Sequence, residues 1–488
     1  MNLNQTLQEK YPHLEVSVLA LSEVQKDNES FRIESFYFLK KYFDIENKIQ
    51  KIGFKYLDEI SIKVTDGTHY TPTYTDKGVI FLSSLNIGEN YLNLESGYKY
   101  ISGDEHKKLS KRCLPQEYDI LLRKVGGENI YACVVPKLEF EFSIFVSIAL
   151  VRINANLFSP YFVSTFINSK YGRQQLIRQA KGIAQLDLHL EDLRKLKIPI
   201  LPMEFQLEIE KMVKDSHKAL EESKELYKKA EEMLYLELGI DPKNPLQSLL
   251  DSKTNNPTKS PNISIRTLKE SFLKTGRLDS EYYQSKYEDI EKFIKSYPNG
   301  YDSFSNIISN KDSNFTPKNN ENYNYIELAN IGNNGNINAP ISDLGKNLPT
   351  RARRMVSKGD IIISSIEGSL SSCALITQEF DKHLVSTGFF VLNSKLLNGE
   401  TLLVMFKSQI FQEYLKKFPS GTILCAINKE ELSNILIPKI DSITQEKIAN
   451  HIRKSFKLRT EAKALLEDAK AQVEFAINRG GGINNFAN

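Results

Sequence analysis

The stretch "GIAQLDLHLEDLRKLKIPILPMEFQLEI", residues 182–209, decides how this chain is organised, because a second version of it occurs further on. "GTILCAINKEELSNILIPKIDSITQEKI", residues 421–448, begins 239 positions later and aligns with it without a gap. Both versions run from a glycine turn through a short apolar segment into a helical pattern. Repetition at this spacing predicts two similar modules in one chain.

Other stretches are matched in the same order in both halves of the sequence. They are "RIESFYF" with "RLDSEYY", "HYTP" with "NFTP", and "LPQEYDILLRKVGGE" with "VSKGDIIISSIEGSL", which begin at residues 32 and 277, 69 and 314, and 114 and 356. A shared order of landmarks indicates a duplication. Because identity between the halves is low, we expect a common backbone plan with different surface chemistry.

Each half opens with a short helical pattern, continues with β-type runs broken by Gly, Asn and Pro, and closes with a helix and then a long helix. This order predicts an α+β fold with two tandem pseudo-symmetric domains of mixed β structure and short helices, joined by two long helices. The predicted segments are a first domain at 1–201, a long helix at 202–240, a linker at 241–262, a second domain at 263–441, a long helix at 442–478 and a flexible tail at 479–488.

Both long helices carry apolar residues at spacings of mostly three and four, the pattern of a seam for a partner helix. At about 35 residues each, they would be roughly 50 Å long. We expect the two helices to cover each other; the alternative is that each packs on its own domain. The predicted interface residues are Ile209, Val213, Leu220, Ala230, Ile448, Ile452, Ala462, Leu465, Ala469 and Val473.

Composition limits the classes of function. The chain has 64 basic and 61 acidic residues, a net charge of +3, so any affinity for nucleic acid must come from local clusters. The four cysteines are widely separated, which favours a reducing cytoplasm over a disulfide scaffold or zinc site. The N-terminus is polar, so we expect no signal peptide. The apolar run "SIFVSIALVRI" is about half the length needed to cross a bilayer.

Common enzyme motifs are missing from the sequence. It contains no phosphate-binding G-x-x-x-x-G-K-[ST] loop, no G-x-G-x-x-G turn and no H-E-x-x-H, and its seven histidines are scattered. We therefore predict no catalytic residue and no metal ligand in this chain.

The loop "TDGTHYTP" resembles the mouth of a site, but its second version, "NKDSNFTP", replaces His69 with Asn314 and Asp66 with Lys311. Only one half could therefore use the histidine for catalysis. We favour a recognition loop that contacts a macromolecule, with a solvated turn as the main alternative. The candidate contact residues are Thr68, His69, Tyr70 and Asn314.

Basic clusters recur at equivalent places in both halves, where a solvated charged rim is the alternative to a binding surface. Phosphates are the commonest partner of such clusters. The candidates are Lys107, Lys108, Lys111, Arg112, Arg178, Lys181, Arg351, Arg353, Arg354, Lys358, Lys416 and Lys417. Ser83 and Asn86, near the end of one β-type run, and Asn330 in the other half are further candidates for contact with such a partner; if it is DNA, arginine to guanine and asparagine or glutamine to adenine are the expected base contacts.

These motifs together resemble the specificity (S) subunits of type I restriction-modification systems, over nearly the whole chain. The first version keeps the family pattern at Gly182, Gln185, Leu193, Ile198, Pro199, Pro202 and Gln206. The second keeps Gly421, Leu432, Ile437, Pro438 and Gln445, but has Asp441 and Thr444 where the family favours a second proline and Glu-Gln.

The resemblance implies two target recognition domains joined by two antiparallel helices, each domain reading one half of a split DNA sequence. It implies two methyltransferase (M) subunits that bind S-adenosylmethionine, restriction/translocase (R) subunits for cleavage, and no cofactor or chemistry in this chain itself. A helix pair of about 50 Å against a DNA turn of about 34 Å predicts an unread gap of about five to eight base pairs. The alternatives are a type IIB-like system with a fused nuclease-methyltransferase partner, and a coiled-coil scaffold that binds only protein.

Overall fold

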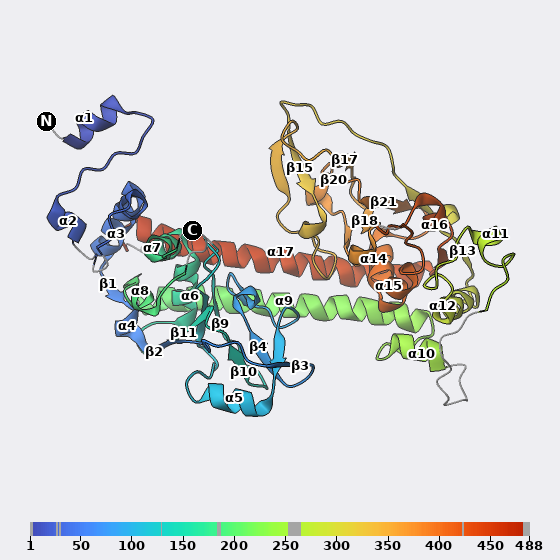
Figure 1. The fold of residues 1–488 in the computed structure, drawn as a ribbon, viewed down its shortest axis with the longest axis horizontal. Coiled ribbons are helices and arrows are strands. Elements are labelled where there is room, and N and C mark those ends of the chain that lie inside the picture. The colour runs from blue at the N-terminus through green and yellow to red at the C-terminus, as the bar shows by residue number, and fades with distance from the viewer. Residues whose placement is uncertain are drawn as a thin grey trace. The chain divides into compact units, whose positions relative to one another are not determined.

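The computed structural model describes residues 3–25, 28, 31–127, 129–182, 187–251, 265–421 and 424–481. The chain divides into two compact units, Met1–Ala219 with Glu461–Asn488, and Leu220–Thr460 (Figure 1). Each unit has its own hydrophobic core, and both long helices contribute to both units.

The first unit mixes short helices with short strands. Its elements are α1 (Leu3–Lys10), α2 (Leu21–Gln25), η1 (Ser35–Phe38), α3 (Lys40–Ile52), β1 (Phe54–Tyr56), α4 (Leu57–Ile60), β2 (Ser61–Asp66), β3 (Tyr74–Thr75), β4 (Val79–Leu82), η2 (Ser84–Asn86), β5 (Ile87–Gly88), β6 (Tyr91–Leu92), β7 (Lys99–Ile101), α5 (Gly103–Ser110), β8 (Ile120–Arg123), β9 (Ala132–Val134), β10 (Phe142–Ile144), β11 (Ile148–Ile153), α6 (Pro160–Asn168), α7 (Lys170–Gln179), α8 (Leu190–Arg194) and β12 (Lys197–Pro199), followed by the long helix α9 (Met203–Glu237).

The second unit repeats this plan. Its elements are α10 (Pro245–Asp251), α11 (Phe272–Thr275), α12 (Ser285–Lys295), β13 (Tyr301–Ser303), α13 (Phe304–Ile307), β14 (Ile308–Asn310), β15 (Asn322–Ile326), η3 (Leu328–Asn330), β16 (Ile341–Leu344), β17 (Ala352–Met355), β18 (Ile361–Ser364), η4 (Glu367–Ser369), β19 (Cys373–Leu375), η5 (Gln378–Phe380), β20 (Leu384–Ser386), β21 (Phe389–Ser394), α14 (Gly399–Lys407), α15 (Gln409–Leu415), α16 (Lys429–Ser433) and β22 (Leu436–Pro438), followed by the long helix α17 (Ser442–Asn478).

The strand order shows that the two units are copies of one fold. The central sheet has the order β2-β11-β8-β9 in the first unit and β14-β21-β18-β19 in the second. A two-stranded antiparallel sheet also recurs, as β1-β12 and β13-β22. The second four-stranded sheets share one parallel pair, β4 with β10 and β15 with β20, but differ in their other strands. The predicted α+β fold with an internal repeat is confirmed.

The glutamine that the two repeated stretches share has a structural reason. Gln206 on α9 accepts a hydrogen bond from the backbone N–H of Ser159, at 2.9 Å, and donates to the carbonyl of Leu201. Gln445 on α17 does the same with Asn398, at 2.9 Å, and Ile440. Ser159 and Asn398 are the N-caps of α6 and α14, the helices that lie in the two cores. The glutamine therefore fastens each long helix to its domain while satisfying backbone groups at a helix start.

Within each unit, the segments of α9 and α17 run antiparallel (Figure 1), and their apolar side chains lie in one core cluster. In the first unit, Ile209 and Val213 of α9 lie in one core cluster with Ala469 and Val473 of α17. In the second, Ala230 lies in one cluster with Ile448 and Ile452. Among the other predicted seam residues Ala462 is buried, while Leu220 and Leu465 are half-buried. The same clusters include residues of α6 and α14, so each helix packs on its domain as well as on its partner.

Hydroxyl groups bridge the middle of the helix pair. Ser216 donates to the carbonyl of Ala462 at 2.7 Å, and the Ser223 and Ser455 hydroxyl oxygens lie 2.9 Å apart. Both serines of the second pair are fully buried. Small residues let the helices approach here, and every hydroxyl finds a partner, as buried polar groups require.

Several predicted boundaries differ from the observed units. Each unit takes part of both long helices, because the halves of each helix pack on different cores. Part of the predicted linker forms α10, whose Leu249 is buried in the second core. Residues 252–262 of that linker, residues 482–488 of the predicted tail, and Gln185 of the repeated motif lie outside the described residues. None of the helices that the structure describes is both long and apolar enough to cross a membrane.

Candidate nucleic-acid interface

In the first unit, the loop that follows β2 lies against the end of the basic segment formed by α5 and the two residues after it. Arg112 donates from Nη1 to the carbonyl of Gly67 at 3.1 Å, and its Nη2 pairs with the Asp66 carboxylate at 2.5 Å. The Arg112 side chain is still 52% exposed. The fold therefore joins "TDGTHYTP" and "EHKKLSKR", two stretches the sequence analysis singled out separately, into one surface.

Asp66 is the centre of this surface. Its buried carboxylate lies 3.0 Å from Lys124 Nζ and 3.0 Å from His69 Nε2, in addition to Arg112. Burial raises the pKa of Asp66, but hydrogen bonds from Lys124 and His69 outweigh burial and bring the pKa below its usual value. The group is therefore an ionised carboxylate that holds cationic and polar side chains in place at the loop.

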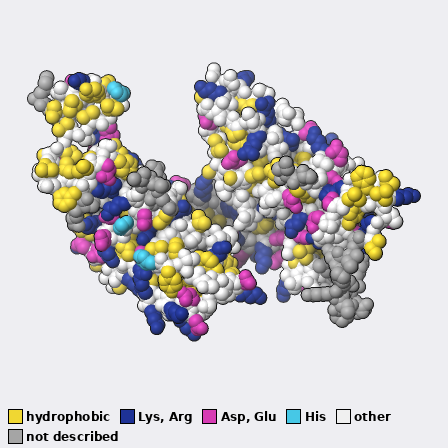
Figure 2. Space-filling view, viewed as in Figure 1, with side chains coloured by type: hydrophobic (Ala, Val, Ile, Leu, Met, Phe, Trp, Pro, Cys, Tyr) yellow, Lys and Arg dark blue, Asp and Glu magenta, His cyan; other side chains and the backbone are white. Residues whose placement is uncertain are grey.

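A cavity of about 320 Å³ opens beside the loop, lined among others by Thr68, His69, Tyr70, Lys108 and Arg112. Thr68 is buried and its hydroxyl bonds within the loop, whereas Tyr70 is exposed and donates to Glu105 at 2.5 Å. We call Lys107, Lys108, Lys111 and Arg112 the α5 cluster. Its members are exposed, and Figure 2 shows basic side chains gathered over α5.

The second unit builds the equivalent surface from β17. The Phe315 backbone N–H in "NKDSNFTP" donates to the carbonyl of Arg353 at 2.6 Å, so loop and basic segment again meet. Arg354 is half-buried and donates to the carbonyl of Phe389 at 2.7 Å. Burial lowers the pKa of the Arg354 guanidinium, while Asp312 raises it. We call Arg351, Arg353, Arg354 and Lys358 the β17 cluster; Arg351 and Lys358 are exposed, as is Asn314 in the loop.

The charges under the two loops are arranged in opposite ways. Where the first unit has the buried acid Asp66, the second has Lys311, whose Nζ lies 2.7 and 2.8 Å from the two oxygens of Asp360. Asp119 occupies the matching position in the first unit and pairs instead with Arg152, at 2.7 and 2.8 Å. The two surfaces therefore share a backbone but differ in chemistry.

The candidates for base contact near the η helices have structural bonds instead. Asn86 is fully buried and its Oδ1 accepts from the backbone N–H of Ser83 at 3.0 Å, and Ser83 itself is half-buried. Asn330 accepts in the same way from Glu327 at 2.7 Å. The side-chain amides also donate to carbonyls further along, so both asparagines shape a turn. These contacts favour a structural role over the predicted contact with DNA.

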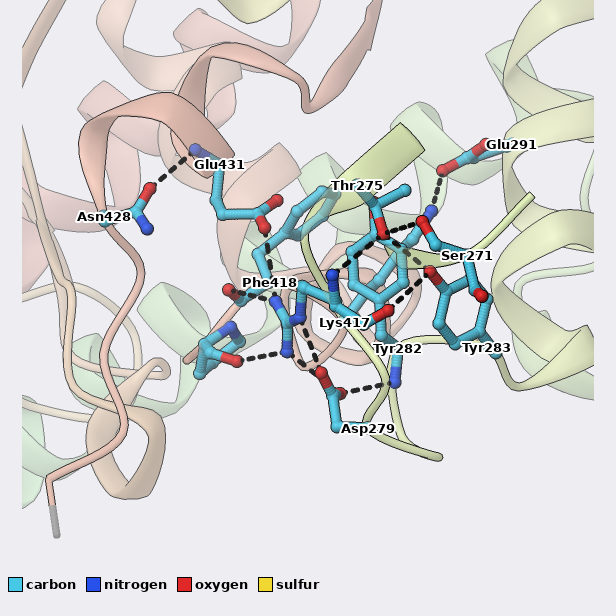
Figure 3. A network of polar contacts seen from close by, with 12 residues as sticks. Ser271, Thr275, Asp279, Tyr282, Tyr283, Glu291, Lys417, Phe418, Asn428 and Glu431 are labelled. Atoms are coloured by element: carbon cyan, nitrogen blue, oxygen red, sulfur yellow. Dashed lines mark hydrogen bonds and ion pairs between the residues drawn. The ribbon is translucent and has the colours of Figure 1, made fainter. Parts of the chain in front are cut away.

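Four further basic candidates pair with acids of their own unit. Arg178 donates to the carbonyl of Tyr37 at 2.9 Å and pairs with Glu46, and only 13% of its side chain is exposed. Lys417 pairs in the same manner with Glu291 and is 12% exposed (Figure 3). Burial and pairing argue against these two residues as phosphate contacts, because a buried, paired cation is not presented to a phosphate. The other two candidates are more exposed: Lys181 pairs with Asp192 and Lys416 with Glu413.

Sequence reasoning missed the cations that fasten each domain's opening segment. Arg32 donates to the carbonyls of Arg178 and Gln179 at the end of α7. Arg277 donates to the carbonyls of Phe418 and Pro419 and pairs with Asp279, part of the network in Figure 3. The repeated pattern of Arg followed by an acid two positions later was the available signal. Lys124 was also missed, because nothing in the sequence marks a lysine as buried.

No group of three or more His, Cys, Asp or Glu side chains is arranged to hold a metal ion within the described part of the chain.

Comparison with known proteins places these surfaces in context. No family model matches the chain. A 133-residue segment is 29% identical to the specificity subunit of the type I restriction enzyme HindI from Haemophilus influenzae, and covers 26% of this chain and 28% of that relative. The matched segment therefore spans less than a third of the relative's length.

Solved structures of the same kind of subunit were also found. The type I restriction-modification S subunit from M. genitalium is 12% identical, with a TM-score of 0.43, and the match covers 88% of this chain and 95% of that one. The HsdS subunit from Thermoanaerobacter tengcongensis is 14% identical, with a TM-score of 0.25 and coverages of 88% and 97%. On the strength of the sequence match, the chain resembles the specificity subunits of type I restriction-modification systems, as its repeated motifs predicted.

Proposed function

We propose that this chain is the DNA sequence-recognition subunit of a type I restriction-modification complex, which reads a bipartite target with one half per unit. The observation that carries the proposal is the duplication itself: one strand order is built twice, and each copy sets a basic cluster against the same loop. A protein that reads one continuous site needs no second copy of such a surface.

The difference between the copies supports two unlike half-sites. Exposed lysines of the α5 and β17 clusters suit phosphate oxygens, which position a protein on DNA without reading sequence. The loop tips present His69 and Tyr70 in one unit and Asn314 in the other. Base edges in the major groove are read by such polar side chains and by arginine, so different tips select different bases.

Chemistry in this proposal belongs to partner subunits. Two methyltransferase subunits, each with bound S-adenosylmethionine, would modify the target, and restriction/translocase subunits would cleave it. A base must be rotated out of the duplex before it can be methylated, at a cost of a few kcal/mol. This chain would contribute to that step by holding the duplex in one position against the methyltransferase.

The direct test is co-expression of the chain with its methyltransferase subunit, followed by sequencing of modified bases in the host DNA. We expect one split target with two short half-sites and an unread gap of about five to eight base pairs. The purified chain alone should transfer no methyl group. Methylation by the chain alone, or a single uninterrupted target, would contradict the proposal.

A charge reversal separates DNA recognition from a scaffold that binds only protein. Changing Arg351, Arg353 and Arg354 to Glu should strongly weaken DNA binding by the assembled complex, because phosphate contacts become repulsive. Since Arg354 is half-buried, the Arg351→Glu single variant, at an exposed position, controls for misfolding. A scaffold would keep its function in both variants.

A further inference from the structure

A cavity of about 260 Å³ lies in the first unit, away from the loop and the α5 cluster. It is bounded by α3, α7, α8 and the residues before and within β12. Three aromatic rings line it, those of Tyr37, Tyr42 and Tyr56, together with the side chains of Gln175 and Gln179. An apolar protein cavity of about 150 Å³ is enough to bind benzene, so this cavity has room for an aromatic ring.

The second unit shows what the same place holds in the other copy. When the two copies are aligned in sequence, Gln175 corresponds to Tyr414 and Gln179 to Phe418. The first pairing is visible in the hydrogen bonds: Gln175 Oε1 accepts from the backbone N–H of Lys197, and the Tyr414 hydroxyl accepts from that of Leu436.

Both aromatic side chains of the second unit are buried. The rings of Tyr414 and Phe418 meet edge to face with their centroids 5.0 Å apart. Figure 3 shows Phe418 at this place, with Tyr282 and Lys417. Two glutamines line this place in the first unit. In the second unit, two aromatic side chains of the chain itself occupy the same place.

Part of the frame around the place is shared by both units, although Leu436 replaces Lys197 in the second. Glu46 pairs with Arg178 and with Lys197 in the first unit, and Glu291 pairs with Lys417 in the second. The cation lies over a tyrosine ring in each case, at 4.4 Å from the Tyr37 centroid and 4.8 Å from the Tyr282 centroid.

Several of the charged side chains around the cavity are already paired: Glu46 is shared by Arg178 and Lys197. Asp192, the other acid in its lining, pairs with Lys181 at 2.9 Å. An aromatic ring would add contacts to the three tyrosines without breaking these ion pairs.

We propose that this cavity receives an aromatic side chain presented by a methyltransferase subunit. The inference rests on the proposed function for the identity of the partner. A protein side chain is favoured over a free small molecule because protein side chains occupy the equivalent place in the second unit. An aromatic anchor in a preformed pocket is the usual form of an interface hot spot. Two partner copies would then be held unequally, one through this anchor and one without it.

The first experiment uses the absence of tryptophan from the chain. N-acetyltryptophanamide, titrated with the full chain under selective excitation of the indole, should show a saturable blue shift in its emission. The Gln175→Tyr/Gln179→Phe variant copies the second unit and should abolish the shift. Gln179→Phe alone keeps the backbone bonds of Gln175 and should weaken the shift, which covers the case in which the double variant does not fold. Asn156→Phe, at an exposed turn of the same unit, is the matched control and should bind as the native chain does.

The second experiment measures binding of the methyltransferase subunit to the chain. Filling the cavity should lower the affinity for one of two bound copies by about tenfold or more, and leave the other copy unaffected. A native chain that gives no blue shift, a filled cavity that still gives one, or unchanged affinity in the filled variant would overturn the inference. Such results would refute the aromatic anchor alone, provided that the native complex still methylates its split target. A native complex without sequence-specific methylation would refute the proposed function instead.

Discussion

Replacing one buried carboxylate in each unit, Asp66 in the first and Asp360 in the second, by its neutral isostere should affect the two units unequally. Asp66→Asn removes the charge that faces Lys124, whose side chain is 7% exposed. Asp360→Asn removes the charge that faces Lys311, whose side chain is 39% exposed. Both acids are almost completely buried, at 2% and 0% exposure, and each has other polar partners besides the cation: His69 and Arg112 at Asp66, Asn393 and the backbone N–H of Ser357 at Asp360.

The expected magnitude follows from what each cation can do after the change. Lys124 would be left as a buried charge without its partner, which costs about 3–5 kcal/mol. Lys311 can turn toward water, so its unit should lose only the value of a hydrogen bond to a charged group, about 1.5–3 kcal/mol. We therefore expect Asp66→Asn to cost roughly 1–2 kcal/mol more than Asp360→Asn.

Hydrogen exchange measured by mass spectrometry can assign each loss to its unit. Amides of β2 and β11 report on Asp66, the last residue of β2, and those of β18 and β21 report on Asp360, which directly precedes β18, because these strands pair in the two central sheets. Exchange under native conditions gives local opening free energies without requiring two-state unfolding of the whole chain. Equal losses in both units, or a loss at Asp66 below about 1 kcal/mol, would refute the reasoning about burial.

Three further outcomes are expected. Burial raises the pKa of Asp66, but hydrogen bonds from Lys124 and His69 lower it overall. The ionised carboxylate therefore stabilises the first unit above about pH 4, and this stabilisation is lost as the pH falls through the lowered pKa. Hydrogen exchange of β2, measured across pH, should show the loss in the native chain and not in Asp66→Asn. Changing the three lysines of the α5 cluster to Gln should reduce the slope of log binding constant against log salt concentration by up to about 2.7 for the assembled complex. Fluorescence anisotropy on target DNA measures this slope, and an unchanged slope would show that these lysines do not contact phosphates. Ile452→Ala, at a fully buried position of the helix seam, should cost about 2–5 kcal/mol in the opening of α17, whereas Ile443→Ala, at an exposed position of the same helix, should cost less than about 1 kcal/mol.

The internal repeat could be predicted because matching residues occur in the same order in both halves of the sequence. Gln206 and Gln445 recur at one position because each satisfies a backbone group at the start of a core helix, a local requirement that both copies must meet. The apolar seam of the long helices could also be predicted, because a helix that buries one face needs apolar residues at spacings of three and four. Features that depend on local geometry or on one buried face can therefore be predicted from sequence patterns.

Partners from distant parts of the chain leave no such record. Arg178 and Lys417 look like surface cations in the sequence, but Glu46 and Glu291 lie more than a hundred positions away, and only folding brings the pairs together. Nor does the pattern distinguish Asn86 as a buried turn-former from an exposed reader of bases.

The amino-acid sequence by itself determined the duplication, the α+β plan of each copy and the pairing of two long helices, because these depend on periodicity and on matched order along the chain. Only the tertiary structure decided which charged side chains face solvent at the loops and which are neutralised inside, and which copy keeps an open cavity. Burial and ion pairing are set by contacts between residues far apart in the chain, and the electrostatics of a candidate interface depend on those contacts.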